Sequence, residues 1–145
     1  MGLVLLDSNI LIDLFNGIGV AEVEIAYHAN IAISAITWAE VAVGLTSSQL
    51  VEFEEVVSNL PIYILHTDDS IIKESVRLRK MSITRKKAGT GDKLKTPDAI
   101  IMATANVTGR TLITRNPGDF RDVKLMRVPY QVTDNVVHNI AARPV

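Results

Sequence analysis

Leu3-Val4-Leu5-Leu6-Asp7-Ser8-Asn9 opens the chain with four apolar residues, followed at once by three polar ones. A short continuous apolar run is typical of a strand buried on both faces, whereas Asp, Ser and Asn are residues that begin helices. From Ile10 onward, apolar residues recur at helical spacing until Asn16-Gly17. The stretch therefore predicts a buried parallel strand that leads directly into a helix, with Asp7 at the junction.

The same alternation of apolar runs and helical patterns continues along the chain. Further strands are expected at residues 31–33, 61–64, 111–114 and 125–128. Helices are expected at 20–28, 37–43, 49–57 and 97–108, and a long one begins near 68, with Ile71, Ile72, Val76 and Leu78 as core positions. Strands that alternate with helices predict a mainly parallel sheet covered on both faces. We expect one domain over residues 1–145, with its core at 3–130 and a C-terminal tail from 133.

Composition restricts the possible functions. The chain has no cysteine, which excludes a disulfide framework, a zinc–thiolate site and a thiol nucleophile. The formal net charge of −1 means that any nucleic-acid surface must be local. No signal-peptide pattern is present and no apolar stretch is long enough to cross a bilayer, so we expect a cytoplasmic protein without a membrane partner.

Four carboxylates are expected at one edge of the sheet. Parallel sheets bind their ligands beyond the C-terminal ends of the strands. Asp7 directly follows the first strand, Glu40 and Asp98 lie in the first turns of two helices, and Asp119 lies in the turn after the strand at 111–114. Each acid also has an ordinary explanation: Asp7 and Asp98 suit helix starts, Asp119 suits a turn, and Thr37-Trp38-Ala39-Glu40 matches a capping box.

Together the four acids favour a metal site. Crowded carboxylates repel one another and must bind protons or cations. Carboxylate oxygens without histidine or cysteine are the ligands of Mg²⁺ or Mn²⁺ rather than of zinc. Such ions lower the pKa of a bound water, which suits hydrolysis of phosphodiester bonds. Asp13 lies nearly two helical turns beyond Asp7, and we expect it to be peripheral to the site.

Four segments of the sequence resemble PIN domains, and among them the VapC-type toxins of toxin–antitoxin pairs. They are Leu5-Leu6-Asp7-Ser8-Asn9-Ile10-Leu11-Ile12-Asp13, Ile33-Ser34-Ala35-Ile36-Thr37-Trp38-Ala39-Glu40, Thr96-Pro97-Asp98-Ala99-Ile100-Ile101-Met102-Ala103-Thr104-Ala105 and Leu112-Ile113-Thr114-Arg115-Asn116-Pro117-Gly118-Asp119-Phe120. The resemblance covers residues 3–130 and implies a PIN-like three-layer α/β/α sandwich with a central, mainly parallel sheet.

The resemblance also implies an activity and a partner. It implies a Mg²⁺- or Mn²⁺-dependent endoribonuclease that is the toxin of such a pair and is inhibited by a small antitoxin protein. Asp7 and Asp98 match the principal metal ligands, and Glu40 and Asp119 match the acids that bind metal or orient the attacking water. The positions that support the acids by hydrogen bonds are matched by Ser8, Thr114 and Asn116.

A basic region precedes Asp98. Eight of the fifteen Lys and Arg residues lie between residues 77 and 95. We read residues 86–95 as a mobile loop, and either a solvated charged surface or a track for RNA phosphates explains the charge. The candidates for RNA contact are Arg85, Lys86, Lys87, Lys93 and Lys95.

Two other classes of function fit parts of the pattern. A phosphatase of the haloacid-dehalogenase type also begins with a buried strand and an Asp, but it usually carries a second Asp two positions later, where this chain has Asn9. A phosphorylated receiver-type domain would need an acidic pair before the site strand, and the sequence offers no convincing one. A third alternative is a binding module without catalysis, in which the acids only cap helices. Such a module would show no saturable binding of metal, whereas the nuclease would. The apolar helices at 20–28 and 49–57 suit a homodimer or an antitoxin groove.

Overall fold

A parallel sheet of five strands forms the centre of the part of the molecule that the structure, a computed structural model, describes, namely residues 2–143. Residues 1, 144 and 145, which include the end of the expected tail, lie outside this range. The strand order is β3-β2-β1-β4-β5, and every pair is parallel. The strands are β1 (Val4–Leu6), β2 (Ile31–Ser34), β3 (Ile62–Leu65), β4 (Thr111–Ile113) and β5 (Met126–Arg127).

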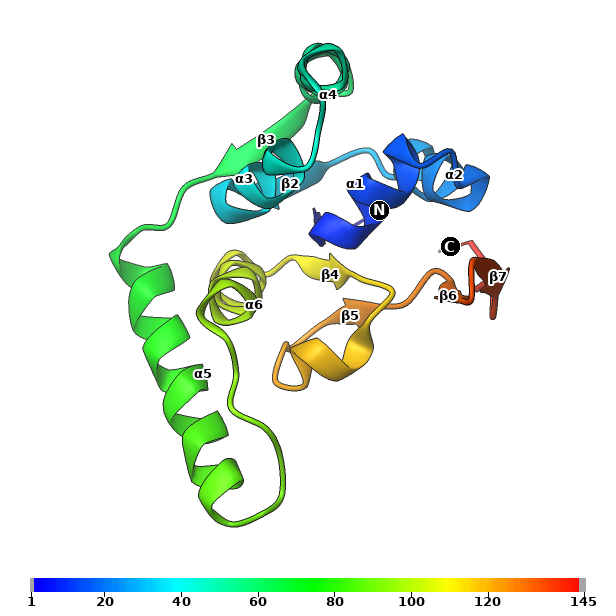
Figure 1. The fold of residues 1–145 in the computed structure, drawn as a ribbon. Helices are drawn as coiled ribbons and strands as arrows, with labels where there is room; N and C mark the ends of the chain where they lie inside the picture. Colours follow the sequence, from blue (N-terminus) through cyan, green and yellow to red (C-terminus); the bar gives the residue numbers. More distant parts are fainter. Residues whose placement is uncertain (1, 144–145) are drawn as a thin grey trace.

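Helices cover both faces of this sheet (Figure 1). One face packs against the first four helices, which are α1 (Ser8–Phe15), α2 (Gly19–Tyr27), α3 (Ala35–Val43) and α4 (Ser47–Asn59). The other face packs against α5 (Asp69–Lys87) and α6 (Thr96–Thr108). The expected three-layer α/β/α sandwich with a central parallel sheet is therefore confirmed.

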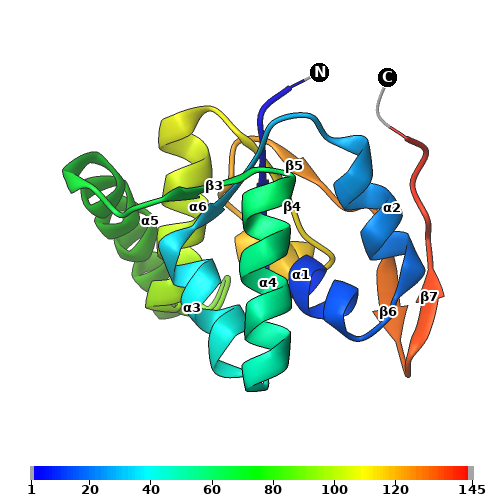
Figure 2. The same ribbon diagram turned by 90° about the horizontal axis from the view of Figure 1, so that it is seen from above.

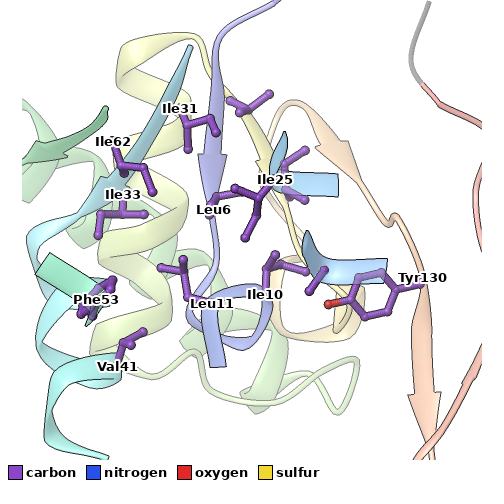
Figure 3. Close-up of a cluster of buried hydrophobic side chains, with 13 residues drawn as sticks. Leu6, Ile10, Leu11, Ile25, Ile31, Ile33, Val41, Phe53, Ile62 and Tyr130 are labelled. Carbon is purple, nitrogen blue, oxygen red and sulfur yellow. The ribbon is translucent and has the colours of Figure 1, made fainter. Parts of the chain in front are cut away.

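Successive residues of the central strands β1, β2 and β4 enter the two cores in turn. Leu6 and Ile33 belong to the core under α1–α4, whereas Leu5 and Ala32 belong to the core under α5 and α6. This alternation follows from the pleat of a strand, whose side chains point to opposite faces. It explains why β1 is apolar at every position, as the sequence predicted for a strand covered on both faces. Figure 3 shows the first core, where Leu6 and Ile33 meet Leu11 and Phe53.

Helix α5 departs from the prediction at two core positions. Ile71 and Leu78 are buried as expected, but Ile72 and Val76 are 45% and 46% exposed. The buried residues of α5 are Ile71, Ser75, Leu78 and Ser82, which recur at intervals of three and four residues. The helix therefore packs through one narrow face, on which the two small serines let it lie close to α6. It also continues to Lys87, so the start of the expected loop at 86–95 is helical.

The chain ends in a hairpin where the sequence predicted only a tail. β6 (Gln131–Thr133) and β7 (Val136–His138) pair antiparallel, and Asp134 and Asn135 connect them with positive φ angles. Asn and Asp tolerate this left-handed conformation, which two-residue hairpin turns require. In Figure 2 the hairpin lies beside α2, at the opposite end of the molecule from α5. Over residues 2–143, no helix has the length and apolarity needed to cross a membrane.

Candidate active site

Asp7 occupies the junction between β1 and α1, as the sequence predicted. It is the N-cap of α1 and is 4% exposed. Its carboxylate accepts hydrogen bonds from the backbone N–H of Ser8 at 2.7 Å, the amide of Asn9 at 2.8 Å and the hydroxyl of Thr114 at 2.8 Å. The Asp7 N–H donates to the Ile113 carbonyl at 2.9 Å. These bonds fix Asp7 where the central strands β1 and β4 end.

Glu40 does not belong to a capping box, so that explanation of its position is wrong. Helix α3 begins at Ala35, and its N-cap is Ser34, whose hydroxyl accepts the N–H of Ile36 at 3.2 Å. The Thr37–Glu40 spacing therefore falls inside the helix rather than at its start. Thr37 Oγ1 and Glu40 Oε1 are buried, and neither has a hydrogen-bond partner in the described part of the chain. Glu40 is thus a partly buried acid with a polar atom left free inside the protein.

Asp98 and Asp119 come from the second half of the chain. Asp98 lies in the first turn of α6, where Pro97 also stands and the N-cap Lys95 makes no side-chain capping bond. Asp119 is exposed and lies in the short 3₁₀ helix η1 (Pro117–Phe120). Both line one cavity of about 420 Å³, which lies between α5, α6 and η1. Four separate segments therefore present the four predicted acids.

Neighbouring acids raise the pKa values of Asp7, Glu40 and Asp98. Burial, and then the charge of Asp119, raises the pKa of Asp7, although its hydrogen bonds from Thr114 and Ser8 oppose the rise. Burial, followed by the charges of Asp7 and Asp98, raises the pKa of Glu40. For Asp98, burial and the charges of Asp119 and Asp7 raise the pKa to about 6, against the opposing charge of Lys95. The carboxylates therefore crowd one another, and a cation would relieve their repulsion.

The residues fit a hard divalent cation in an open site. Within residues 2–143, no three acidic or histidine side chains lie close enough to enclose a metal ion by themselves. Mg²⁺ seldom needs such an enclosure, because it keeps several waters and binds through one or two carboxylates together with substrate phosphates. The unpartnered Glu40 Oε1, beside Asp7 and Asp98, is the atom in greatest need of such a ligand. Asp7, Asp98, Glu40 and Asp119 are the residues that would hold the ion.

The supporting residues surround Asp7. Ser8 donates through its backbone, and its hydroxyl lies 3.4 Å from the same Asp7 oxygen. Thr114 is fully buried and, besides donating to Asp7, accepts the N–H of Asn116 at 3.1 Å. Asn116 therefore contributes its backbone to this network. Sequence reasoning missed Asn9, whose amide donates to Asp7; its place two residues after a strand-end Asp was the available signal.

Asp13, which we expected to be peripheral to the site, is a buried residue. It is 2% exposed, with Arg115 Nε 2.7 Å and the Tyr130 hydroxyl 2.8 Å from its Oδ2. It is not one of the crowded acids, but it is joined to the segment that follows β4. No local pattern in the sequence indicated this, since both partners lie more than one hundred residues away.

The predicted RNA-contact residues divide into three groups. Arg85 lines the cavity beside Asp98, but its guanidinium is paired with Asp122, with one N–O distance of 3.2 Å. Lys93 and Lys95 line the same cavity and are exposed. Lys86 and Lys87 are exposed at the end of α5, outside the residues that line the cavity.

The segment after α5 has fixed contacts with the body of the protein. Arg79 Nε donates to the Leu94 carbonyl at 3.2 Å, and the Leu94 N–H donates to Ser82 at 3.0 Å. Arg121 also donates to the Thr90 carbonyl at 3.1 Å. Residues 88–95 form no helix or strand, so the expected loop begins after α5, and these contacts hold it along the cavity wall.

Comparison with known proteins agrees with this fold. A chain from a toxin–antitoxin complex of Klebsiella pneumoniae is 36% identical, with a TM-score of 0.71, and the match covers 89% of this chain and 99% of that one. VapBC2 of Rickettsia felis, bound to a promoter DNA fragment, gives 20% identity and a TM-score of 0.70, over 86% and 97% of the two chains. FitAcB of Neisseria gonorrhoeae is 23% identical with a TM-score of 0.67, and the match covers 86% of this chain and 95% of that one.

The family is established by sequence. No curated protein matched the chain. The family model described as PIN domain, however, matches residues 4–125, which include all four acids and the whole parallel sheet except its last strand. The predicted resemblance to the PIN domains of VapC-type toxin–antitoxin pairs is thus confirmed, and the chain belongs to the PIN domain family.

Proposed function

We propose that this chain is a Mg²⁺- or Mn²⁺-dependent endoribonuclease and the toxin of a toxin–antitoxin pair, acting in the cytoplasm. The observation that carries the proposal is the crowded set Asp7, Glu40, Asp98 and Asp119, with the unpartnered Glu40 Oε1 inside it. The similarity to chains of toxin–antitoxin complexes supports the biological role.

The residues have distinct roles in the proposed hydrolysis. A bound Mg²⁺ or Mn²⁺ would supply a water of lowered pKa and neutralise charge on the phosphate. Asp7 and Asp98 would hold the cation, since they lie where β1 ends and where α6 begins. Glu40 and Asp119 would complete the ligand set or orient the attacking water. Ser8, Asn9 and Thr114 keep the Asp7 carboxylate fixed by donating to it.

The decisive experiment is RNA cleavage by the purified chain with Mg²⁺, with Mn²⁺ and with EDTA. Asp7→Asn and Asp98→Asn should abolish cleavage, because each removes a ligand charge while keeping the shape of the side chain. Asp69→Asn is the matched control, since Asp69 also lies in a first helical turn but is exposed and far along the chain from the four acids. Cleavage that survives EDTA or both site substitutions would refute the proposal.

The cavity wall provides the proposed surface for RNA. Lys93 and Lys95 are exposed on it, beside Asp98. Lys93→Glu should raise KM and reduce the dependence of binding on salt, by about 0.7 in the logarithmic slope for each phosphate that the variant no longer neutralises. Lys73→Glu, on the exposed surface of α5, is the control. Equal salt slopes for Lys93→Glu and the wild type would show that RNA does not follow this wall.

The environment of Asp7 favours a nuclease over a phosphatase of the haloacid-dehalogenase type. The residue two positions after Asp7 is Asn9, and its amide donates to the Asp7 carboxylate at 2.8 Å. An amide in that place holds the carboxylate but has no proton to give to a leaving group. Calorimetric titration with Mn²⁺ separates the remaining alternative, because a non-catalytic module without a metal site would bind no Mn²⁺ saturably.

A groove between α2 and α4 is the proposed place for the antitoxin. It has a volume of about 480 Å³, an apolar floor that includes Ile25 and Val56, and acids on its walls at Glu22, Glu52 and Glu55. A basic, amphipathic segment of the antitoxin would complement this surface. In co-expression with the neighbouring reading frames, Glu52→Lys with Glu55→Lys should release the partner, and retention of the partner would refute this placement.

We also propose a homodimer. The edge strand β3 and helix α5 expose large apolar side chains, with Tyr63 52%, Ile72 45% and Val76 46% accessible. Exposed apolar surface of this kind marks interaction sites. Light scattering should give twice the chain mass of 15.9 kDa for the wild type and a lower mass for Val76→Glu. A monomeric wild type would refute the dimer.

A further inference from the structure

Asp13 is a buried charge that the proposed chemistry does not use. Its carboxylate accepts Arg115 Nε at 2.7 Å and Nη2 at 3.3 Å, and the hydroxyl of Tyr130 at 2.8 Å. Asp13 is 2% exposed and Tyr130 is 1% exposed. Burying a charge is unfavourable unless it is paired and hydrogen-bonded, and here two distant segments supply these partners. Asp13 therefore joins α1 to both of them.

The first of these segments carries part of the active site. Arg115 stands between Thr114, which donates to Asp7, and Asn116, whose N–H donates back to Thr114. The Arg115 N–H lies 3.5 Å from Oδ1 of Asn9, the residue whose amide donates to Asp7. The segment is thus bonded to α1 at its first turn through Asn9 and one turn later through Asp13. Asp119 follows four residues after Arg115 on the same segment.

The second segment leads into the C-terminal hairpin. Tyr130 directly precedes β6, and its ring belongs to the core under α1–α4 (Figure 3). The hydroxyl in Figure 3 is directed toward α1, beside Ile10. Val132 and Val137 of the hairpin pack against the same core. The family model ends at residue 125, so Tyr130 belongs to a part of the chain that the family match does not include.

We propose that Asp13, Arg115 and Tyr130 are positioning residues for the carboxylate site, and that the C-terminal hairpin acts on the site through them. The three residues make no hydrogen bond or ion pair to the four acids within the described part of the chain. They fix residues 114–119 against α1, and so set where Thr114 meets Asp7 and where Asp119 stands. Asp13 also holds the Arg115 guanidinium through two of its nitrogens, which fixes the Arg115 side chain against α1. The inference rests on the proposed function only for its metal-binding readout.

Tyr130→Phe is the cleanest test, because it removes one hydroxyl and keeps the ring in the core. Asp13→Asn is the stronger variant, because it leaves the Arg115 charge unpaired. Thr104→Val is the control: Thr104 is also fully buried, and its hydroxyl donates within α6 to the Ile100 carbonyl at 2.7 Å. The variants are compared by calorimetric titration with Mn²⁺, by hydrogen exchange of residues 114–119 and by urea denaturation.

Tyr130→Phe should weaken Mn²⁺ binding roughly tenfold, as is usual when a residue that orients metal ligands is removed. It should also speed hydrogen exchange in residues 114–119. Thr104→Val should lose about as much stability as Tyr130→Phe, but it should keep the wild-type Mn²⁺ affinity and the wild-type exchange rates of residues 114–119. If folded Tyr130→Phe and Asp13→Asn keep the wild-type Mn²⁺ affinity and exchange, the positioning role is wrong. A wild-type chain that binds no Mn²⁺ refutes the proposed function instead, and the exchange rates alone then decide the positioning role.

Discussion

Replacing Asp98 with Asn should make the protein more stable at neutral pH, although the substitution should abolish cleavage. Burial and the charges of Asp119 and Asp7 raise the pKa of Asp98 from 3.8 to about 6. A pKa shift of this size means that folding disfavours the ionised form of Asp98, relative to the protonated form, by roughly 3 kcal/mol. Asp98 is only partly buried, so solvent screening reduces the penalty to about 1–2 kcal/mol. Asn removes the ionised form and with it this penalty.

The opposing effect comes from the helix. An acid in the first turn stabilises a helix by about 0.3–1 kcal/mol, and Asn would lose that contribution. The net gain at pH 7 is therefore about 1 kcal/mol, or a few degrees in Tm for a chain of this size. In Asp69→Asn, the same kind of position in α5 lacks the crowding, so that control should lose stability slightly.

The gain in stability should depend on pH. Because the folded pKa lies above the unfolded one, the folded state binds more protons between pH 3.8 and about 6. The contribution of Asp98 to stability is thus fully present below pH 3.8 and is lost as pH rises through 6. Urea denaturation of both proteins between about pH 4.5 and 7.5 should show a gain for Asp98→Asn that grows with pH. A loss of stability that is equal at every pH would show that Asp98 is only a helix-start residue.

Three further substitutions should change stability. Glu24→Gln should cost about 3 kcal/mol in urea denaturation, because it leaves the partly buried Arg127 charge without its carboxylate partner. Burial alone would raise the pKa of Glu24, but the bonds from His28 and Arg127 outweigh it and lower the pKa to about 2. The stability of the wild type should therefore fall as the pH drops from 4.5 toward 2, whereas Glu24→Gln should not show this fall. Phe53→Ala should cost about 3–5 kcal/mol, since Phe53 is fully buried, and a value below about 1 kcal/mol would place it outside the core. Gly109→Ala should cost about 1 kcal/mol, because Gly109 ends α6 at φ +69°, and an unchanged Tm would contradict that conformation.

Local patterns were sufficient to predict most of the fold. The run that ends at Leu6 is apolar at every position because helices cover both faces of β1, and Pro97 and Gly109 stand where a helix begins and ends. The hairpin was missed although Asp134-Asn135, between Val132-Thr133 and Val136-Val137, is a recognisable two-residue turn. The wrong interpretation of Thr37–Glu40 has a different cause, because Ser34 serves both as the last residue of β2 and as the N-cap.

The acids of the candidate site, and Ser8 and Thr114 beside them, were predictable from the sequence, but the long-range contacts around the site were not. Strand ends and helix starts are local features, so Asp7 and Asp98 were identified from their neighbours in sequence. The contact of Asp13 with Tyr130 joins residues 117 positions apart, and no local pattern encodes it. The pairing of Arg85 with Asp122 is likewise a tertiary contact, and it removes from the surface a charge that the sequence alone counted as available.

The order of the strands has a consequence for synthesis on the ribosome. β1 is made first but lies at the centre of the sheet, and its partner β4 begins only at Thr111. Until then one edge of β1 has no partner in the nascent chain, and an open edge of an apolar strand is prone to aggregate. The proposed nuclease is equally incomplete, because Asp119 emerges after β4. If the proposed function holds, a nascent chain would therefore be unable to cleave the RNA being translated until Asp119 has emerged.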